Sequence, residues 1–265
     1  MPLTSFQESV ARLLSTNRTE DSHLAGGAAL HLAPSSKRYS NDLDYFHDSV
    51  ERVATAFADD RALLEKHGYS VHVDLNQPGY IRASVSQASD TTSIEWAHDS
   101  AWRFLPPIKN DIVGYQLHPM DLATNKLLAL AGRDEARDFL DILMIDREIL
   151  PLGALCWAAV GKDPGFSPRS LLELLKRRGK YQPEDFKRLR LSEQVDLEDL
   201  KAQWLDAIAL AERFIDAQDP TEIGCLYYDH AREEFVAPPP KDSAARSTVV
   251  PHFGRPGGVL PAIRS

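Results

Sequence analysis

Cysteine is scarce in this chain, and long apolar runs are absent. Cys156 and Cys225 are the only cysteines among 265 residues and form no Cys-x-x-Cys pair, so we expect two buried free thiols and neither a disulfide scaffold nor a zinc cluster. The longest apolar run, residues 149–161, is interrupted by Pro151 and Gly153 and is too short to cross a bilayer. No basic segment followed by an apolar one opens the sequence, which predicts a soluble, unsecreted, cytoplasmic protein.

Positive charge is in the minority. The chain has 30 Lys and Arg against 39 Asp and Glu, a net charge of −9, which argues against a protein that binds nucleic acid with its whole surface. The stretch from Lys176 to Arg190 is a local exception, because its basic residues outnumber Glu184 and Asp185. It is either the solvated face of two helices or a contact surface for an RNA acceptor.

The hydrophobic pattern predicts an α+β protein. Hydrophobic residues make up 43% of the chain and charged residues 26%, which is typical of one or two globular domains. We expect residues 1–118 to form a mixed β-sheet with flanking helices, and residues 119–220 to form a helical bundle. Residues 221–265 are expected to hold a short strand-like segment and, from Pro238, an unfolded tail, because proline, glycine and serine dominate there.

Two carboxylates one residue apart are the most chemically specific feature. Asp42 and Asp44 fall in a predicted strand, where side chains at positions i and i+2 leave the same face. Two like charges held side by side favour a bound cation. Glu95, on a later predicted strand, is the expected third carboxylate, and Asp74 is its competitor.

A glycine pair precedes these aspartates. Gly26 and Gly27 fall between a predicted strand and a helix start, where backbone N–H groups meet phosphate oxygens without interference from a Cβ. A lone Gly-Gly pair is a weak signal, since most such pairs are only turns. Ser40, two residues before Asp42, is close enough to touch a bound phosphate or to be modified; the alternative is a strand residue that faces solvent.

Further charged residues lie on two predicted helices. Lys126 falls inside an apolar stripe over 121–131, so its ammonium either has a buried partner or snorkels at the edge of the core. Arg137, Asp138 and Asp141 follow at spacings of three and four residues on the next helix. That charged face is either a solvated lattice of ion pairs or part of a site.

The carboxylates suit phosphoryl or nucleotidyl transfer. A two-metal site needs about three carboxylates to hold two Mg²⁺ ions roughly 3.5 to 4 Å apart, and Asp42, Asp44 and Glu95 meet that need. The leaving pyrophosphate needs positive charge and backbone donors, for which Lys126 and the glycine pair are the candidates. We therefore expect Mg²⁺ as cofactor and an NTP as substrate.

The order of these motifs resembles that of a known family. Over about residues 20–145 the chain is similar to the AbiEii/AbiGii toxin family of the DNA polymerase β-like nucleotidyltransferase superfamily. The motifs that carry the resemblance are Gly26-Gly27-x-Ala29-Leu30, Ser40-x-Asp42-Leu43-Asp44-Tyr45-Phe46, Asp121-Leu122, Lys126-Leu127-x-Ala129-Leu130 and Arg137-Asp138-x-x-Asp141.

The resemblance implies roles for individual residues. It makes Asp42 and Asp44 the metal-binding pair, and it assigns to Lys126 a contact with the nucleotide phosphates. It also implies that Asp141 or Asp138 completes the catalytic site. Nucleotide contacts are expected from Gly26, Gly27, Ser40, Arg137 and Asp138. The family often has Gly-Ser where this chain has Gly-Gly, so a serine contact to phosphate is missing here.

The resemblance also implies a function. We expect a metal-dependent, toxin-like nucleotidyltransferase of a toxin–antitoxin or abortive-infection system. It would transfer NMP from an NTP to an RNA acceptor, with the 3′ end of tRNA as the expected target, and an antitoxin protein would restrain it. One alternative is a small-molecule enzyme of the aminoglycoside nucleotidyltransferase type, which suits the acidic surface. Another is a nucleotide-binding regulatory module without turnover.

Overall fold

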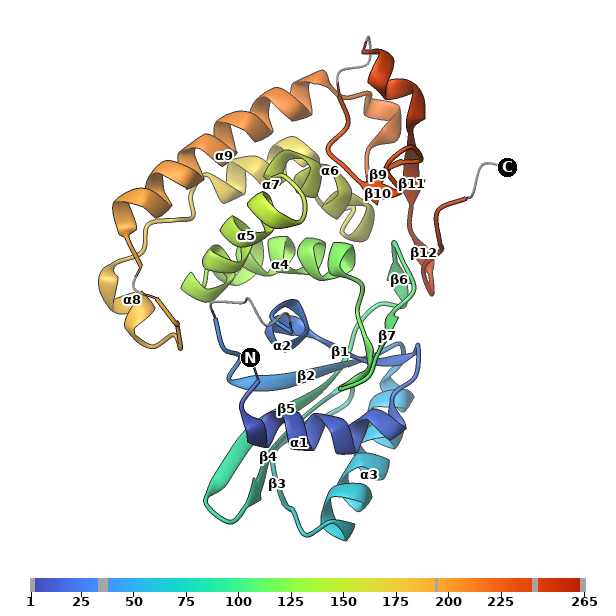
Figure 1. Cartoon of the computed structure of the whole chain (residues 1–265), viewed down its shortest axis with the longest axis vertical. Coiled ribbons are helices and arrows are strands. Elements are labelled where there is room, and N and C mark those ends of the chain that lie inside the picture. Colours follow the sequence, from blue (N-terminus) through green and yellow to red (C-terminus); the bar gives the residue numbers. More distant parts are fainter. Residues whose placement is uncertain (1–2, 33–37, 194, 240–242, 263–265) are drawn as a thin grey trace. The chain divides into compact units, whose positions relative to one another are not determined.

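The computed structural model describes residues 3–32, 38–193, 195–239 and 243–262 (Figure 1). The chain divides into two compact units. Unit 1 comprises the residues up to His118 together with Arg190–Glu193 and Pro256–Gly258. Unit 2 comprises Pro119–Leu189 and the remaining residues beyond 193. The predicted α+β class is confirmed, and each unit is described by itself below.

Unit 1 is a mixed sheet with flanking helices, as the sequence predicts. Among the described residues its strands pair in the order β3-β4-β5-β2-β1-β8-β7. Strand β2 runs parallel to β5 and antiparallel to β1. The elements are α1 (Ser5–Leu14), η1 (Ser15–Asn17), β1 (Ser22–Ala25), α2 (Gly26–Leu30), β2 (Asp42–His47), α3 (Val50–Lys66), β3 (Ser70–Gln77), β4 (Tyr80–Gln87), β5 (Asp90–His98), β6 (Trp102–Arg103), β7 (Ile108–Asn110) and β8 (Gly114–Gln116).

The two faces of β2 have different environments. Its burial alternates, so that Leu43, Tyr45 and His47 are fully buried while the residues between them are half-buried. Helices α1 and α3 pack against the sheet, as Figure 1 shows. Burying a side chain as large as Leu or Ile stabilises a fold by about 1.5–3 kcal/mol. This burial fixes which face of β2 points inward, and the aspartates take the other face.

Unit 2 is a helical bundle with a small sheet. Helix α6 lies at its centre, because all its residues up to Val160 are buried and it contacts α4, α7, α9 and β9. The elements are α4 (Pro119–Arg133), α5 (Ala136–Glu148), α6 (Leu152–Lys162), α7 (Pro168–Leu175), α8 (Pro183–Lys187), α9 (Leu197–Ala217), η2 (Pro220–Glu222), β9 (Cys225–Asp229), β10 (Glu234–Phe235), η3 (Ala244–Thr248) and β11 (Val249–Phe253). Strand β12 (Arg255–Pro256) has one residue in each unit.

The apolar run noted in the sequence is this central helix. None of the helices in the described ranges combines the length and apolarity that spanning a membrane requires. Cys156 on α6 and Cys225 on β9 are both free and buried, as predicted. Burial raises the pKa of Cys225 to about 12, so its thiol stays protonated at neutral pH.

The C-terminal segment differs from the prediction. We expected an unfolded tail from Pro238, but the described residues of this segment form η3 and β11. Strand β11 pairs antiparallel with β9 from Val249 opposite Asp229 to Phe253 opposite Cys225. The buried Val249 packs with Trp157 of α6. Local composition misses this strand because its partner and the apolar surface beneath it come from distant segments.

Candidate active site

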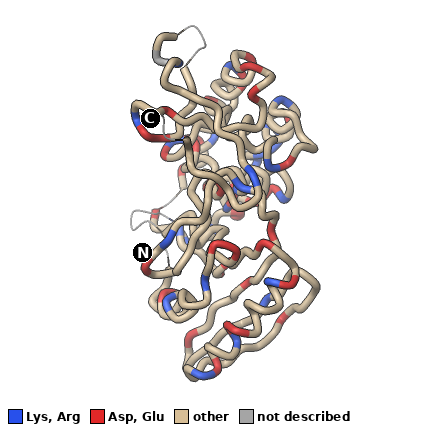
Figure 2. The backbone as a smooth tube through the Cα atoms, turned by 90° about the vertical axis from the view of Figure 1, so that its right-hand side faces the viewer, with Lys and Arg blue, Asp and Glu red and all other residues tan. Residues whose placement is uncertain are grey.

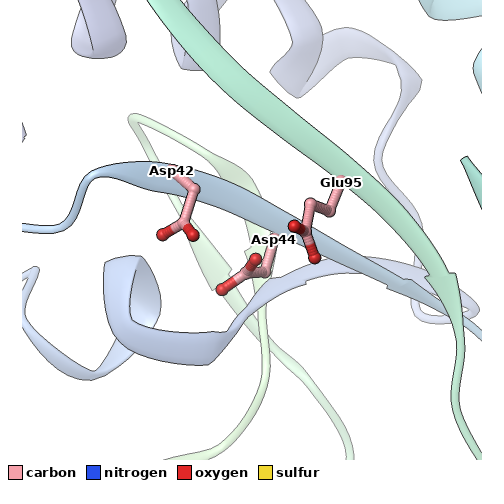
Figure 3. Close-up of side chains that lie close together, drawn as sticks. All are labelled: Asp42, Asp44 and Glu95. Carbon is pink, nitrogen blue, oxygen red and sulfur yellow. The ribbon is translucent and has the colours of Figure 1, made fainter. Parts of the chain in front are cut away.

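Three carboxylates meet on two neighbouring strands of unit 1. Asp42 and Asp44 leave the same face of β2, and the parallel register with β5 places Glu95 opposite Asp44. Each of the three half-buried side chains offers one oxygen, and these oxygens lie within 4.8 Å of one another. Figure 3 shows all three pointing toward one small volume. Asp74 lies elsewhere, on β3, where it accepts a hydrogen bond from Ser84 Oγ at 2.8 Å.

This donor set suits a hard divalent cation. Two carboxylates about 5 Å apart repel each other by about 3 kcal/mol at an effective dielectric constant of 20. A bound cation removes that repulsion and turns it into attraction. The donors in the cluster are all carboxylate oxygens. Hard cations such as Mg²⁺ and Mn²⁺ bind these oxygens, whereas softer metals prefer sulfur or nitrogen ligands.

Gly26 makes room for one of these carboxylates. Its φ is +59°, a left-handed conformation that costs an L-residue about 1 kcal/mol or more. A Cβ at this position would lie 1.8 Å from Asp44 Oδ2, far inside van der Waals contact. The sequence predicted that the glycine lets phosphate approach the backbone here. The structure shows that the Asp44 carboxylate occupies the space that a side chain at Gly26 would fill.

Gly27 makes room for an arginine that the sequence analysis did not identify. A Cβ at Gly27 would lie 2.8 Å from Arg38 Nη2 and 3.4 Å from Ser40 Oγ. Arg38 is 8% exposed, and its Nε donates to His31 Nε2 at 3.2 Å. A buried guanidinium therefore lies beside the glycine pair. The available signal was a basic residue four positions before Asp42, in a loop that composition alone marks only as polar.

Ser40 is directly linked to the acidic pair. Its side chain is 1% exposed, and its Oγ donates to Asp42 Oδ1 at 3.0 Å. The alternative in which Ser40 faces solvent is therefore wrong. The backbone carbonyl of Ser40 accepts from Gln7 Nε2 at 3.3 Å, which ties the entry of β2 to α1. This packing orients the Asp42 carboxylate before any ligand binds.

Tyr80 orients the third carboxylate, Glu95, as Ser40 orients Asp42. Burial raises the pKa of the Tyr80 phenol to about 12, and its hydrogen bond to Glu95 and the Glu95 charge add to the shift. Tyr80 is therefore a neutral donor to Glu95 at physiological pH. Arg82, two residues along β4, is the register partner of Glu95. Alternation along β4, which places Tyr80 and Arg82 on one face, is the sequence signal for both residues.

The charged residues on the helices form a separate cluster inside unit 2. Lys126 Nζ of α4 lies 2.9 Å from Asp138 Oδ1 and 3.0 Å from Asp141 Oδ2 of α5, and the lysine side chain is 8% exposed. The ammonium thus has buried partners, and the snorkelling alternative is wrong. Arg133 Nε lies 2.6 Å from Asp138 Oδ2. Burial alone would raise the pKa of Asp138, but hydrogen bonds and charges from Arg133 and Lys126 outweigh it and hold that pKa below its usual value.

Arg137 has a different neighbour. Its Nε lies 2.9 Å from Glu135 Oε2. The structure therefore joins Lys126, Asp138 and Asp141, but it does not join Arg137 to them. The four residues share a motif in the sequence without sharing one set of contacts.

Comparison with solved structures gives the class of fold. MenT4, a nucleotidyltransferase toxin from Mycobacterium tuberculosis, is 16% identical and covers 82% of this chain and 83% of its own, with a TM-score of 0.51. JHP933 from Helicobacter pylori is 19% identical over 80% of this chain and 91% of its own, with a TM-score of 0.47. No protein-family model matches the chain, and neither does any curated protein. The likeness to MenT4 shows that this chain has a nucleotidyltransferase fold.

Proposed function

We propose that this protein is a metal-dependent nucleotidyltransferase that transfers NMP from an NTP to an RNA acceptor. The observation that carries the proposal is the cluster of Asp42, Asp44 and Glu95, with oxygens within 4.8 Å on adjacent strands of a nucleotidyltransferase fold. These residues would hold Mg²⁺, for which two ions is the expected number. The metal would supply Lewis-acid activation of the acceptor hydroxyl and neutralise charge on the phosphates.

The reaction is an in-line displacement at the α-phosphorus. An oxygen–phosphorus bond forms from the acceptor hydroxyl, the bond between the α-phosphorus and the bridging oxygen breaks, and pyrophosphate leaves. The hydroxyl proton passes to a carboxylate of the acidic cluster. The protein's own part is to hold these carboxylates in place, which Ser40 does for Asp42 and Tyr80 does for Glu95.

Positive charge is needed beside the leaving pyrophosphate, on which negative charge develops during the reaction. The buried guanidinium of Arg38 beside Gly27 is one candidate within unit 1. Lys126 is the second, because the motif resemblance assigns it a phosphate contact. Asp141 and Asp138 would then set the position of the Lys126 ammonium. Guanidinium and ammonium groups both bind phosphate oxygens through charge-assisted hydrogen bonds.

The toxin role, the tRNA acceptor and an antitoxin partner belong to the same proposal. They are supported by the motif order shared with the AbiEii/AbiGii family and by the fold shared with MenT4, itself a nucleotidyltransferase toxin. Membership of the AbiEii family is likewise proposed on the motifs alone.

A label-transfer assay tests the proposal. Purified protein is incubated with Mg²⁺, each labelled NTP in turn, and total tRNA. Wild type should label RNA, and Asp42→Ala should reduce labelling by at least a hundredfold. Asp74→Ala is the matched control, because it removes the same charge from β3, outside the cluster, and should keep activity within about twofold. Absence of label on any RNA with wild type would contradict the RNA acceptor.

The small-molecule alternative rests on the net charge of −9, which suits a cationic acceptor. The same assay with an aminoglycoside in place of tRNA separates the two enzymes. Salt-sensitive binding of tRNA would favour the RNA acceptor. Calorimetry that detects Mg²⁺–ATP binding without turnover on either acceptor would favour a regulatory module.

A further inference from the structure

Unit 2 contains a pocket of about 610 Å³. It is lined by the start of α5 and by the segment from Lys180 to Leu189, which includes α8. Acidic and basic side chains both line it. In Figure 2 Lys and Arg are interspersed with Asp and Glu along the chain, so charge counts alone do not identify a binding surface. The ion pairs around the pocket decide which charges are available to a ligand.

The acidic residues of the pocket already have partners. Each of the four carboxylates receives a hydrogen bond or an ion pair from the protein. The pairs are Asp134 with Arg178 at 3.1 Å and with the Tyr181 hydroxyl at 2.6 Å, Glu135 with Arg137 at 2.9 Å, Glu184 with Lys187 at 3.1 Å, and Asp185 with the backbone N–H of Gln182 at 2.8 Å. The negative charge of the pocket is therefore largely neutralised from within.

Two basic residues of the pocket are not paired in this way. Lys180 and Arg188 are exposed and line it, and neither makes an ion pair with any residue in the described ranges. Pairing the acids while leaving these cations unpaired gives the pocket a local excess of positive charge. An anionic ligand meets that excess, whereas a cationic ligand would meet acids that already accept an ion pair or a hydrogen bond from the protein.

The same segment provides a contrast. Lys176 is paired with both Glu173 and Glu212, and Lys187 is paired with Glu184. These lysines would have to give up a partner before they could bind phosphate. The basic stretch from Lys176 to Arg190 is thus divided by its ion pairs into cations that already have an acidic partner and cations that are available to a ligand.

An aromatic wall completes the pocket. Tyr181 is held in place by its hydrogen bond to Asp134 and by ring contacts with Phe139 and Phe186, at centroid distances of 5.1 and 5.9 Å. Leu189 adds an apolar surface to the lining. Proteins bind single-stranded nucleic acids with cations beside a fixed aromatic ring. The phosphates contact the cations, and a base or ribose packs against the ring.

We propose that this pocket binds phosphodiester groups of the acceptor RNA through Lys180 and Arg188, with Tyr181 and Leu189 against the neighbouring base or ribose. The identity of the ligand as an acceptor rests on the proposed function. The binding itself does not, because it follows from the charges and the wall of the pocket.

The test is RNA binding in the absence of NTP and Mg²⁺. A labelled single-stranded RNA is titrated with wild type, with Lys180→Gln/Arg188→Gln, and with the control Lys176→Gln/Arg177→Gln, which removes two positive charges from the same stretch without unpairing an acid of the pocket. We expect the first double variant to bind at least tenfold more weakly at 0.1 M salt, and the control to stay within about threefold of wild type. The salt slope of log K should fall by roughly 1.4 in the first variant, since each single-strand phosphate contact contributes about 0.7.

Several outcomes would overturn the proposal. Equal weakening in both double variants would mean that only the overall charge matters, and unchanged binding in both would place the RNA elsewhere. Loss of Mg²⁺–ATP binding with RNA binding retained would assign the pocket to the nucleotide triphosphate instead. All four substituted side chains are partly or fully exposed, and matching circular dichroism spectra check that each variant is folded.

The outcome is separable from that of the proposed function. Asp42→Ala should bind RNA like wild type while transferring no label. Label transfer by wild type together with unchanged RNA binding by Lys180→Gln/Arg188→Gln would refute the pocket and leave the enzyme proposal intact. RNA binding that depends on Lys180 and Arg188, without transfer to any acceptor, would refute the enzyme proposal and leave the pocket intact.

Discussion

The Asp44 carboxylate occupies the space that a side chain at Gly26 would need. The distance from an ideal Cβ at Gly26 to Asp44 Oδ2 is 1.8 Å, and the backbone there is left-handed, with φ of +59°. Glycine at the start of α2 and aspartate on β2 are therefore structurally coupled. The glycine turn that was expected to contact phosphate also makes room for a carboxylate of the acidic cluster.

Gly26→Ala should harm both the fold and the acidic cluster. The left-handed backbone costs about 1–2 kcal/mol for an L-residue, and the clash displaces Asp44. We expect a lower free energy of unfolding by about 2 kcal/mol or more in urea, and weaker Mn²⁺ binding by calorimetry. Gly132→Ala is the control: nothing lies within 4 Å of its Cβ position on α4, and the change should stabilise the helix by about 0.5–1 kcal/mol. Equal stability of the two variants would contradict this.

Tyr80→Phe should loosen Glu95 without unfolding the protein. The change removes the phenol that donates to Glu95, an interaction worth about 1.5–3 kcal/mol for a charged acceptor. The Mg²⁺ concentration needed for half-maximal activity should rise about tenfold, while KM for the RNA stays nearly constant. Tyr69→Phe, at a residue in ring contact with Phe6, is the matched control. A metal dependence equal to that of wild type would mean that Tyr80 does not position Glu95.

Lys126→Met should destabilise unit 2 strongly. Removing the ammonium leaves Asp141, which is 1% exposed, without its lysine partner, and breaking a buried ion pair typically costs 3–5 kcal/mol. Urea unfolding measures the loss. Lys187→Met, in an exposed pair with Glu184, should change stability by less than about 1 kcal/mol. Adding Asp141→Asn to Lys126→Met should recover part of the loss. If it does not, the cost arises from packing and not from the uncompensated charge.

The buried imidazole of His47 should make the stability of unit 1 sensitive to acid. Burial, followed by the charges of Arg18 and Arg52, lowers the pKa of His47 to about 3, against about 6.5 in an unfolded chain. Between these values the unfolded state binds the proton and the folded state does not. The contribution of neutral His47 to the free energy of unfolding is therefore fully present above about pH 6.5. It is lost as the pH falls toward 3, at up to about 1.4 kcal/mol per pH unit.

The measurement is urea unfolding at pH 7.5 and pH 5. Wild type should lose about 2 kcal/mol more than His47→Leu over this interval, because the variant lacks the titrating group. The wild-type imidazole should also show no titration in NMR spectra of the folded protein over the same range. Identical pH dependence in the two proteins would contradict the prediction.

Local periodicity was enough for several features of this protein. Because alternate residues of a strand share a face, the sequence alone placed Asp42 and Asp44 together. Helical spacing predicted helices over 119–220, among which α9 is found as Leu197–Ala217. It also placed Lys126 inside an apolar stripe, and the structure shows that its ammonium has a buried partner. The mixed sheet with flanking helices followed from the same patterns.

Features that depend on long-range pairing were not determined in this way. Composition marked the segment after Pro238 as unfolded, whereas β11 is stabilised there by hydrogen bonds to β9 and by contact with Trp157. Arg38 was overlooked because a polar loop gives no sign that it turns its guanidinium beside Gly27. The basic stretch from Lys176 to Arg190 was left open between a solvated face and an RNA contact surface, because its pairing with Asp134 and Glu212 depends on segments distant in sequence.

The acidic cluster contains both features that the sequence determined and features that only the tertiary structure decided. The sequence by itself determined that two aspartates share one face of β2, because that depends only on neighbours along one strand. Tertiary structure alone decided that Glu95 joins them in place of Asp74, because the choice depends on the parallel register between β2 and β5, strands about 50 residues apart. It also decided that Gly26 must lack a side chain, since the atom it would clash with belongs to Asp44. Spacing within one element is encoded locally, whereas register between elements is set by the packing of the whole unit.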